Sequence, residues 1–475
     1  MKTKAMQHQV EGCRRLAAAP QYFALGAEQG TGKTWMLLAD AERQYESNSI
    51  NALFIIAPNG VHINWIVREI PTHLSVPHRA EFWLSGANKA KTAALRSLLV
   101  PSEELTICAM NVDAVNAKSG MSYAKEFLST YRTMLIVDES QRIKNPSALR
   151  TKRIIELGGA AVSRRIASGT LVSNSPLDLF SQYEFLAPGL LGTRSFRAFT
   201  AEYAELLPPG HPLLAHIGGR GHPQIVKRDK DGRPIFRNTD KLARLMSPHT
   251  FRVTKDQCLD LPAKIYQTHY FDLPPKHQRA YNELKRELRF EREDGQIDVF
   301  TALTIINKLR TVTSGFILVD GEPQQLDATQ RMNALTDLIE DAAGQIIVWA
   351  SFREELRQLA IELKEHGVVT YHGGTSQKDR EHAVDDFQSG KARIFIGNPA
   401  AAGVGLTLTA AQTVIYYSCS YSLEERLQSE DRCHRIGTRH SVLYIDMVAR
   451  GTIDEKIAQS LQAKQSIAAQ IVDSL

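Results

Sequence analysis

The sequence lacks the features of a membrane or secreted protein. No run approaches the roughly eighteen consecutive apolar residues that a membrane-spanning helix needs; the longest strand-like runs are as short as residues 53–56. Lys2 and Lys4 lie near the N-terminus, but polar residues from Gln7 to Glu11 interrupt any apolar stretch, which argues against a secretory signal. These absences predict a cytoplasmic protein.

Cysteines are also few, and the net charge is small. The five cysteines are an odd number without a Cys-x-x-Cys pair, which excludes a disulfide framework and a zinc cluster and predicts reduced thiols. Lys and Arg total 57 against 52 Asp and Glu, so the net charge is only +5. This small excess permits nucleic acid as a partner but does not require it.

Short β-branched and aromatic runs alternate twice with helix-length amphipathic stretches, which is the pattern of a parallel sheet covered by helices. The strands expected in the first half are residues 53–56, 105–108, 134–137 and 164–167. Those expected in the last third are residues 346–349, 368–370, 394–397, 413–417 and 442–445. The sequence therefore predicts two α/β domains in tandem.

Between these halves, from about residue 189 to 331, the alternation stops. Residues 208–237 carry Pro and Gly turn signals, and residues 227–244 are rich in Lys and Arg diluted by three Asp. Either a nucleic-acid-facing insertion or a solvated loop explains this composition. Residues 275–292 predict a charged, exposed helix that projects as an arm from the second domain.

The segment Ala27-Glu28-Gln29-Gly30-Thr31-Gly32-Lys33-Thr34 follows an apolar run at residues 22–25 and precedes a helical stretch at 35–43. Glycines let successive backbone N–H groups face a phosphate, and the helix N-terminus adds positive potential. Lys33 would reach the β- and γ-phosphates, and the Thr34 hydroxyl would bind magnesium. The segment predicts a nucleotide-binding loop.

Two acidic residues, Asp138 and Glu139, follow the expected strand at residues 134–137. Ligands of open α/β sheets bind at the carboxyl ends of the strands. We expect Asp138 to hold magnesium and Glu139 to act as the general base for the attacking water. The alternative, an acidic pair that only ends a turn, is weakened by the phosphate loop in the same chain.

Residues 423–435 are expected to form one helix, on which Gln428, Arg432 and Arg435 share a face. The planar guanidinium suits γ-phosphate oxygens, so this face would reach across an interdomain cleft and stabilise charge during phosphoryl transfer. A solvated face, ion-paired through neighbouring acids, explains the periodicity equally well.

Taken together, these residues resemble the Swi/Snf family of helicase superfamily two. Segments similar to further family motifs are Gln9, Ile56-Ala57-Pro58 with Asn64-Trp65, Asp138 to Asn145, Ser168-Gly169-Thr170, Arg252 to Lys255, Ile347 to Phe352, His372 to Thr375, Gly403 to Thr409, Gln428 to Gly437, and Gly451 to Glu455. Departures are Gln141 for histidine, Leu171 for proline, Thr438 for glutamine, and Ser420-Tyr421-Ser422 for Trp-Asn-Pro.

The resemblance implies two RecA-like parallel-sheet domains in tandem, at residues 1–190 and 331–475, with a mainly helical and irregular insertion at 191–330. It implies catalysis by Lys33, Asp138, Glu139, Gln428, Arg432 and Arg435, and coupling through Gln141, Ser168, Gly169 and Thr170. It implies magnesium at Thr34 and Asp138, and ATP contacts from Gln9, Glu28, Gln29, Gly30, Thr31, Gly32, Lys33, Thr34 and Gly405.

The resulting expectation is a compact bacterial or phage-type motor without additional domains, which uses Mg-ATP to translocate on or remodel double-stranded DNA bound without sequence specificity. A strand-separating or annealing helicase on forked DNA or RNA shares the same core and is the second hypothesis. A non-catalytic scaffold subunit of a repair or defence complex is the third; the presence of Lys33, Glu139, Arg432 and Arg435 argues against it.

Overall fold

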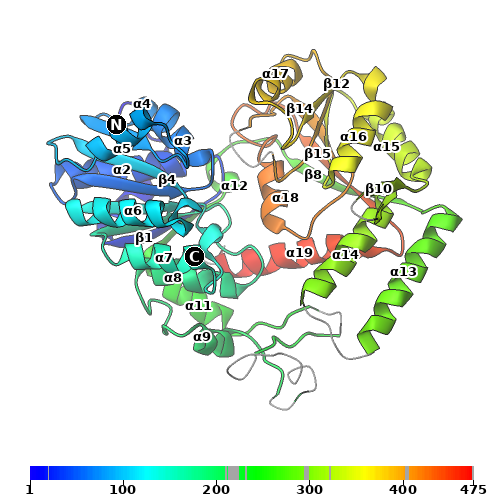
Figure 1. Ribbon diagram of the computed structural model, residues 1–475, viewed down its shortest axis with the longest axis horizontal. Helices are drawn as coiled ribbons and strands as arrows, with labels where there is room; N and C mark the ends of the chain where they lie inside the picture. The colour runs from blue at the N-terminus through cyan, green and yellow to red at the C-terminus, as the bar shows by residue number, and fades with distance from the viewer. Residues whose placement is uncertain are drawn as a thin grey trace. The chain divides into compact units, whose positions relative to one another are not determined.

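The computed structural model describes residues 1–19, 21–208, 211, 224–230, 233–293, 299–319, 322–401 and 406–472. The chain divides into two compact units. Unit 1 comprises Met1–Leu207, Val226–Asp260 and Lys464–Leu475, and unit 2 comprises Pro208–Ile225 and Leu261–Ala463. Each contains one large parallel sheet with helices on both faces (Figure 1).

Unit 1 has a seven-stranded sheet in the order β3-β4-β2-β5-β6-β1-β7, in which every pair of neighbours is parallel. The strands are β1 (Tyr22–Ala27), β2 (Ala52–Ala57), β3 (His78–Phe82), β4 (Leu105–Asn111), β5 (Thr133–Asp138), β6 (Ser163–Ala167) and β7 (Thr250–Val253). Strand β6 lies between β1 and β5. The loops that follow these three strands therefore leave the sheet at the same edge.

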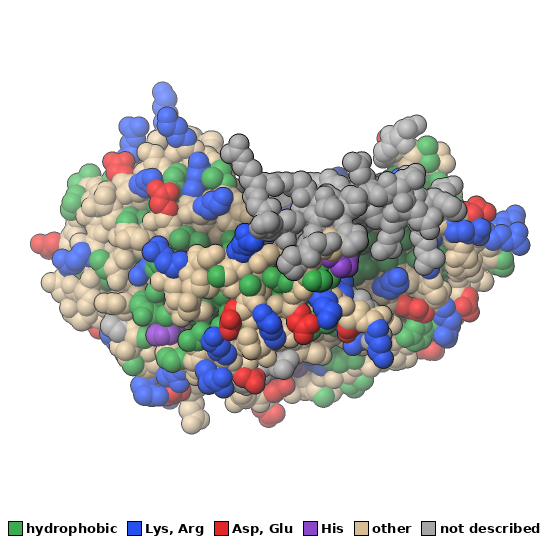
Figure 2. Space-filling view, turned by 90° about the horizontal axis from the view of Figure 1, so that it is seen from below, with side chains coloured by type: hydrophobic (Ala, Val, Ile, Leu, Met, Phe, Trp, Pro, Cys, Tyr) green, Lys and Arg blue, Asp and Glu red, His purple; other side chains and the backbone are tan. Residues whose placement is uncertain are grey.

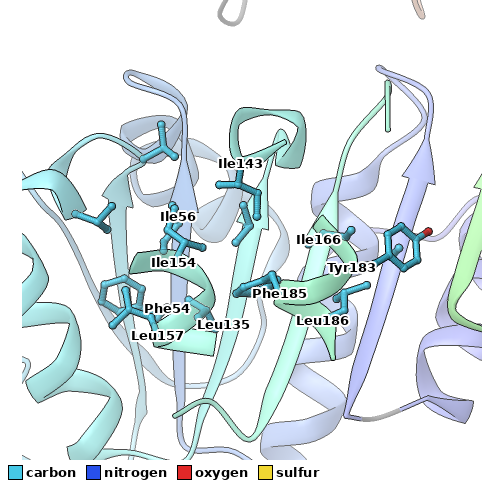
Figure 3. Close-up of a cluster of buried hydrophobic side chains, with 14 of the residues drawn as sticks. Phe54, Ile56, Leu135, Ile143, Ile154, Leu157, Ile166, Tyr183, Phe185 and Leu186 are labelled. Atoms are coloured by element: carbon cyan, nitrogen blue, oxygen red, sulfur yellow. The ribbon is translucent and has the colours of Figure 1, made fainter. Parts of the chain in front are cut away.

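Alternate side chains of the central strands enter two separate cores. On β2, Phe54 and Ile56 join the core against α7 and α8, while Leu53 and Ile55 join the core on the opposite face. Figure 3 shows the first of these cores, in which Ile154 and Phe185 face the sheet. Burial on both faces explains why these strands are continuously apolar in sequence.

The helices of unit 1 divide between the two faces of the sheet. Residues of α1 (Gln7–Ala18), α2 (Lys33–Glu46) and the segment 61–73 enter one core. Residues from the remaining longer helices enter the other. Those helices are α5 (Lys89–Ser97), α6 (Lys118–Thr130), α7 (Leu149–Gly158), α8 (Leu179–Leu186), α9 (Phe196–Tyr203) and α11 (Thr239–Met246).

Unit 2 has a six-stranded parallel sheet in the order β12-β13-β11-β14-β15-β8. The strands are β8 (Lys264–Phe271), β11 (Gln345–Trp349), β12 (Val368–Tyr371), β13 (Ile394–Gly397), β14 (Ala411–Tyr416) and β15 (Val442–Ala449). A separate antiparallel pair joins β9 (Phe316–Val319) to β10 (Glu322–Gln325).

Helices of unit 2 also cover both faces of its sheet. One core takes residues from α13 (Pro275–Glu293), α14 (Val299–Thr313), α15 (Thr329–Asp341), α16 (Arg353–Glu362), the start of α18 (Leu423–Glu430) and the first part of α19 (Ile453–Val472). The other core takes residues from α17 (Gln377–Gln388). The predicted tandem of two parallel-sheet α/β domains is confirmed.

The expected arm at residues 275–292 is a helix, α13, but it is not free of the fold. Two of its side chains, His277 and Tyr281, are buried one turn apart, and Tyr281 belongs to the core of unit 2. The start of the helix is therefore amphipathic, with His277 and Tyr281 buried and Lys276 and Arg279 exposed.

The compact units differ from the three ranges expected from the sequence. The span 191–330 is not a separate region, because β7 extends the sheet of unit 1 while β8 extends the sheet of unit 2. At the other end of the chain, Lys464–Leu475 belongs to unit 1, where Ile471 is buried in the core. Long-range packing decides these boundaries, and local composition does not report it.

None of the helices in the described part of the chain combines the length and apolar content that crossing a bilayer would require.

Candidate nucleotide-binding site

The phosphate loop connects β1 to α2 at the edge of the sheet where parallel strands end. Gly30 and Gly32 have φ of 81° and 84°, a left-handed conformation that glycine adopts without steric cost. Gly32 directly precedes the first residue of α2, Lys33, which is buried, while Thr34 is half-buried in the next position. The predicted loop therefore has the backbone that a phosphate cradle needs.

The cradle is closed on one side by helix α1. A Cβ atom at Gly32 would stand 2.0 Å from Nε2 of Gln9. That Nε2 donates to the Thr31 carbonyl at 3.4 Å, and the Gln9 Oε1 accepts from the Met6 backbone N–H at 2.8 Å. The predicted glutamine thus lies against the loop, with its amide bonded to protein on both sides.

The loop is also bonded to the segment that follows β7. The Glu28 backbone N–H donates to the Val253 carbonyl at 2.9 Å, and the Lys255 backbone N–H donates to the Glu28 carboxylate at 2.8 Å. Lys255 begins α12 (Lys255–Cys258), the last helix of unit 1 before the chain enters unit 2.

Asp138 ends β5, and its carboxylate is buried. Its Oδ2 accepts the indole N–H of Trp65 at 2.9 Å, and its Oδ1 accepts the Glu139 backbone N–H at 2.9 Å. The pKa of Asp138 is raised to about 6, chiefly by burial and then by the negative charge of Glu139, against the opposing effects of the Trp65 bond and the Lys33 charge.

Glu139 has a left-handed backbone with φ of 50°, which is strained for a residue with a side chain. Such strain, of order 1–3 kcal/mol, persists where surrounding contacts hold it and is common at functional sites. The contacts are two amides: Gln141 Nε2 donates to Glu139 Oε2 at 2.7 Å, and Gln29 Nε2 donates to Oε1 at 3.5 Å. The Glu139 carboxylate is therefore oriented by Gln29 of the phosphate loop and by Gln141 of the segment that follows β5.

Further hydrogen bonds connect Gln141 to the loop that follows β6. The Ser168 hydroxyl donates to Gln141 Oε1 at 2.6 Å, and the Thr170 backbone N–H donates to the Ser168 Oγ at 2.8 Å. A Cβ at Gly169 would come within 3.1 Å of the Gln29 backbone nitrogen, so this loop passes directly over the phosphate loop. The residues predicted for coupling thus contact those predicted for binding and catalysis.

The oxygen donors of the site suit magnesium. Mg²⁺ prefers hard oxygen ligands, keeps several waters, and needs only one or two carboxylates from the protein. Asp138 supplies a carboxylate and Thr34 a hydroxyl. No cluster of three His, Cys, Asp or Glu side chains suited to a metal occurs in the part of the chain that the structure describes, and a site of this kind does not need one.

In unit 2 the expected helix at 423–435 is too long. Helix α18 ends at Glu430, and the backbone N–H groups of Cys433 and His434 both reach back to the Glu430 carbonyl. The Thr438 hydroxyl then caps the Cys433 and Arg435 carbonyls, which closes a turn in place of a further helical turn. Arg432 and Arg435 therefore lie beyond the helix, and the shared helical face predicted for them is wrong.

The three predicted residues of unit 2 are still held in defined positions. Gln428 on α18 and Arg432 after it are both buried, so they do not form a solvated face. The Arg432 carbonyl accepts the Leu408 N–H at 2.8 Å, and the Arg435 guanidinium donates to the Leu406 carbonyl and the Thr407 hydroxyl, each at 3.2 Å. Gly405 lies outside the described residues.

Part of the basic stretch at 208–244 also lies outside them. In its described part, Lys227 pairs with Glu205 at 3.4 Å and Lys241 with Glu202 at 2.7 Å. The Arg237 guanidinium donates to the Ala201 and Glu202 carbonyls. Some of this charge is therefore neutralised within the fold.

Two features of the site were not expected from the sequence. One is the indole of Trp65 on the buried carboxylate, and the other is the amide of Gln29 on Glu139. The sequence shows that an Asp-Glu pair ends a strand, but it does not show that Gln29 contacts Glu139 across 110 residues.

Two parallel-sheet units, with a glycine-rich loop hydrogen-bonded to a strand-ending Asp-Glu pair in the first, define the class of phosphate-loop proteins. Residues 14–315 match the SNF2-related domain, and residues 330–437 match the helicase conserved C-terminal domain. Because the first match alone covers more than half of the chain, the protein belongs to the SNF2-related family, which confirms the resemblance seen in the sequence.

Known proteins similar to the chain come from bacteria, archaea and eukaryotes. An uncharacterized ATP-dependent helicase of Mycoplasma genitalium is 25% identical over 452 residues, which cover 93% of this chain and 39% of that protein. The DNA annealing helicase and endonuclease ZRANB3 of Mus musculus is 24% identical over 481 residues, covering 98% and 40%. The chain thus spans about two fifths of the length of these curated relatives.

Among solved structures, the Sulfolobus solfataricus SWI2/SNF2 ATPase core in complex with dsDNA matches with a TM-score of 0.43 and 23% identity, covering 100% of this chain and 94% of that one.

Proposed function

We propose that the protein is an ATP-dependent motor of the Swi/Snf type that binds duplex DNA without sequence specificity and moves along it. The observation that carries this proposal is the continuous hydrogen-bonded path in unit 1. It runs from the phosphate loop through Gln29 and Glu139 to Gln141 and Ser168.

In this proposal the phosphate loop binds ATP. Backbone N–H groups of residues 30–34 face the phosphates, the N-terminus of α2 contributes positive potential, and Lys33 neutralises phosphate charge. The amide of Gln9 closes the loop on the side of α1, and we assign to it the reading of the adenine.

Thr34 and Asp138 would hold a magnesium ion in the occupied site. The bound ion would neutralise phosphate charge as a Lewis acid and would relieve the cost of keeping the Asp138 carboxylate ionised in a buried position. Trp65 and the Glu139 backbone N–H fix the orientation of that carboxylate.

Glu139 acts in the proposal as the general base. A carboxylate oxygen of Glu139 takes the proton from the attacking water, while the amides of Gln141 and Gln29 hold the side chain in place. We assign to Gln428, Arg432 and Arg435 the stabilisation of charge on the transferring phosphoryl group, because a guanidinium fork matches phosphate oxygens.

Our choice of duplex DNA as the partner rests on membership of the SNF2-related family and not on an obvious charged surface. On the face drawn in Figure 2, Lys and Arg side chains are interspersed with Asp and Glu. Binding through phosphates alone would be independent of sequence and would weaken steeply with salt.

Steady-state ATP hydrolysis by the full chain tests the proposal. It is measured without polymer and then with plain duplex DNA, single-stranded DNA, forked DNA and RNA, beside Glu139→Gln. We expect strong stimulation by plain duplex and no turnover by the variant. Stimulation only by forks, single strands or RNA would replace the proposal with an unwinding or annealing helicase, the activity that the name of ZRANB3 carries.

Absence of hydrolysis with every polymer would instead favour a non-catalytic scaffold. Lys33→Ala separates that reading from the motor independently, because the substitution would leave a scaffold's biological activity intact and abolish a motor's.

A further inference from the structure

The side chain of Trp65 is hydrogen-bonded to the Asp138 carboxylate. The indole Nε1 donates to Asp138 Oδ2 at 2.9 Å, and Trp65 is only 1% exposed. The bond lies away from solvent, where a charge-assisted hydrogen bond is strong and directional.

The backbone around Trp65 explains how the indole reaches this position. Residues 61–73 form three consecutive helical segments, α3 (Val61–Asn64), a π-helical turn (Trp65–Glu69) and α4 (Ile70–His73). The Ile70 N–H bonds to the Trp65 carbonyl, the wide spacing of a π-helix. Pro71 follows directly, in the first turn of α4, and has no N–H to give to the Val67 carbonyl, so that α-helical hydrogen bond is missing.

The π-turn separates two kinds of side chain. Trp65 faces the interior, while Val67 and Arg68 on the same turn are exposed. Single π-turns within helices are rare and frequently occur at functional sites. Here the turn places one indole N–H on the carboxylate that the proposed function uses for the metal.

We propose that Trp65 is a positioning residue for the magnesium–nucleotide complex: its N–H, together with the Glu139 backbone N–H on the other oxygen, fixes the orientation of the Asp138 carboxylate that would hold the ion. This inference rests on the proposed function, because it assumes a nucleotide with its magnesium ion in the site. Groups that orient a metal ligand typically contribute 10- to 100-fold to metal affinity.

The test measures binding and does not depend on turnover. Titration calorimetry gives the Kd of ADP in excess Mg²⁺ and in EDTA for the full chain and for Trp65→Phe. Phenylalanine keeps an aromatic ring and removes the N–H. We expect the Kd in EDTA to stay unchanged, and the gain in affinity that Mg²⁺ provides to fall about 10-fold.

Trp35→Phe is the matched control. The Trp35 indole also donates one hydrogen bond of 2.9 Å, but its acceptor is the Thr3 hydroxyl. We expect this variant to keep the wild-type gain from Mg²⁺. An unchanged gain in Trp65→Phe would overturn the inference, and so would equal weakening with and without Mg²⁺, which indicates a structural role only.

A second measurement covers the case in which Trp65→Phe does not fold. The chain has four tryptophans, so ¹⁵N-labelled indole groups give four resonances. Variants at the other three positions assign the Trp65 signal by elimination. Adding Mg²⁺ to the ADP-bound protein should shift that signal and leave the Trp35 signal in place; an unmoved Trp65 signal would contradict the proposal. Wild-type protein that binds no ADP would refute the proposed function first.

Discussion

Replacing Gly32 with alanine tests whether Gln9 closes the phosphate loop as the structure indicates. An alanine in the left-handed region costs about 1–2 kcal/mol relative to glycine. At Gly32 the new Cβ would also stand 2.0 Å from the Gln9 amide, which must therefore move away. Its two hydrogen bonds, to Thr31 and from Met6, contribute about 1 kcal/mol each. Gly32→Ala should thus lose about 3–4 kcal/mol in the free energy of unfolding.

Gly86→Ala supplies the control. Its φ of 71° imposes the same backbone cost, but nothing lies within 4 Å of an added Cβ. We expect a loss of about 1–2 kcal/mol and wild-type ADP affinity. Gly32→Ala should in addition bind ADP at least 10-fold more weakly, because the loop loses the conformation that faces the phosphates.

Urea unfolding followed by circular dichroism and ADP titration measure the two quantities. The double variant Gln9→Ala/Gly32→Ala completes the cycle: with the amide already removed, its loss should be smaller than the sum of the single losses. Equal behaviour of the Gly32 and Gly86 variants, or additive losses in the cycle, would refute the reasoning.

Three further predictions follow from single contacts. Arg165→Met removes the 2.9 Å ion pair of the buried Asp40 carboxylate, which keeps its 2.6 Å pair with Arg43, and should cost about 2–3 kcal/mol in urea unfolding. The loss should be less than about 1 kcal/mol for Arg14→Met, whose ion pair is exposed, and equal losses would contradict this. Gln141→Leu removes a donor to Glu139 and should lower kcat about 10- to 100-fold with KM for ATP unchanged; a change in KM alone would argue against its positioning role. Burial raises the pKa of all five cysteine thiols. At pH 8 the native protein should therefore react slowly with a disulfide reagent, whereas the unfolded protein should show five fast-reacting thiols. A fast-reacting thiol in the native protein would contradict the packing.

The interior strands were easier to predict than the edge strands, of which only β12 was expected from the sequence. The sequence indicated β2, β5 and β11 because strands buried on both faces are continuously apolar. It missed β3, β7 and β8, each of which lies at an edge of its sheet. Three of the five residues of β3 are polar, namely His78, Arg79 and Glu81, and β8 is mostly exposed, so neither strand carries an apolar signal.

The site divides in the same way between local and distant information. Glycines before a helix and an Asp-Glu pair after a strand are local patterns, and the structure places them together. The end of α18 was missed because the turn depends on Thr438 and on a bond from Leu408 to Arg432, neither of which changes the helical periodicity. The contacts of Trp65 and Gln29 depend on tertiary packing and leave no trace in the sequence.

Displacement of a third strand from triplex DNA is the most direct test of the claim that ATP hydrolysis moves this protein along duplex DNA. The account predicts that wild-type protein with ATP displaces the third strand, and that Glu139→Gln, which keeps the binding residues, does not. Duplex-stimulated hydrolysis without any displacement, or displacement by Glu139→Gln, would contradict it.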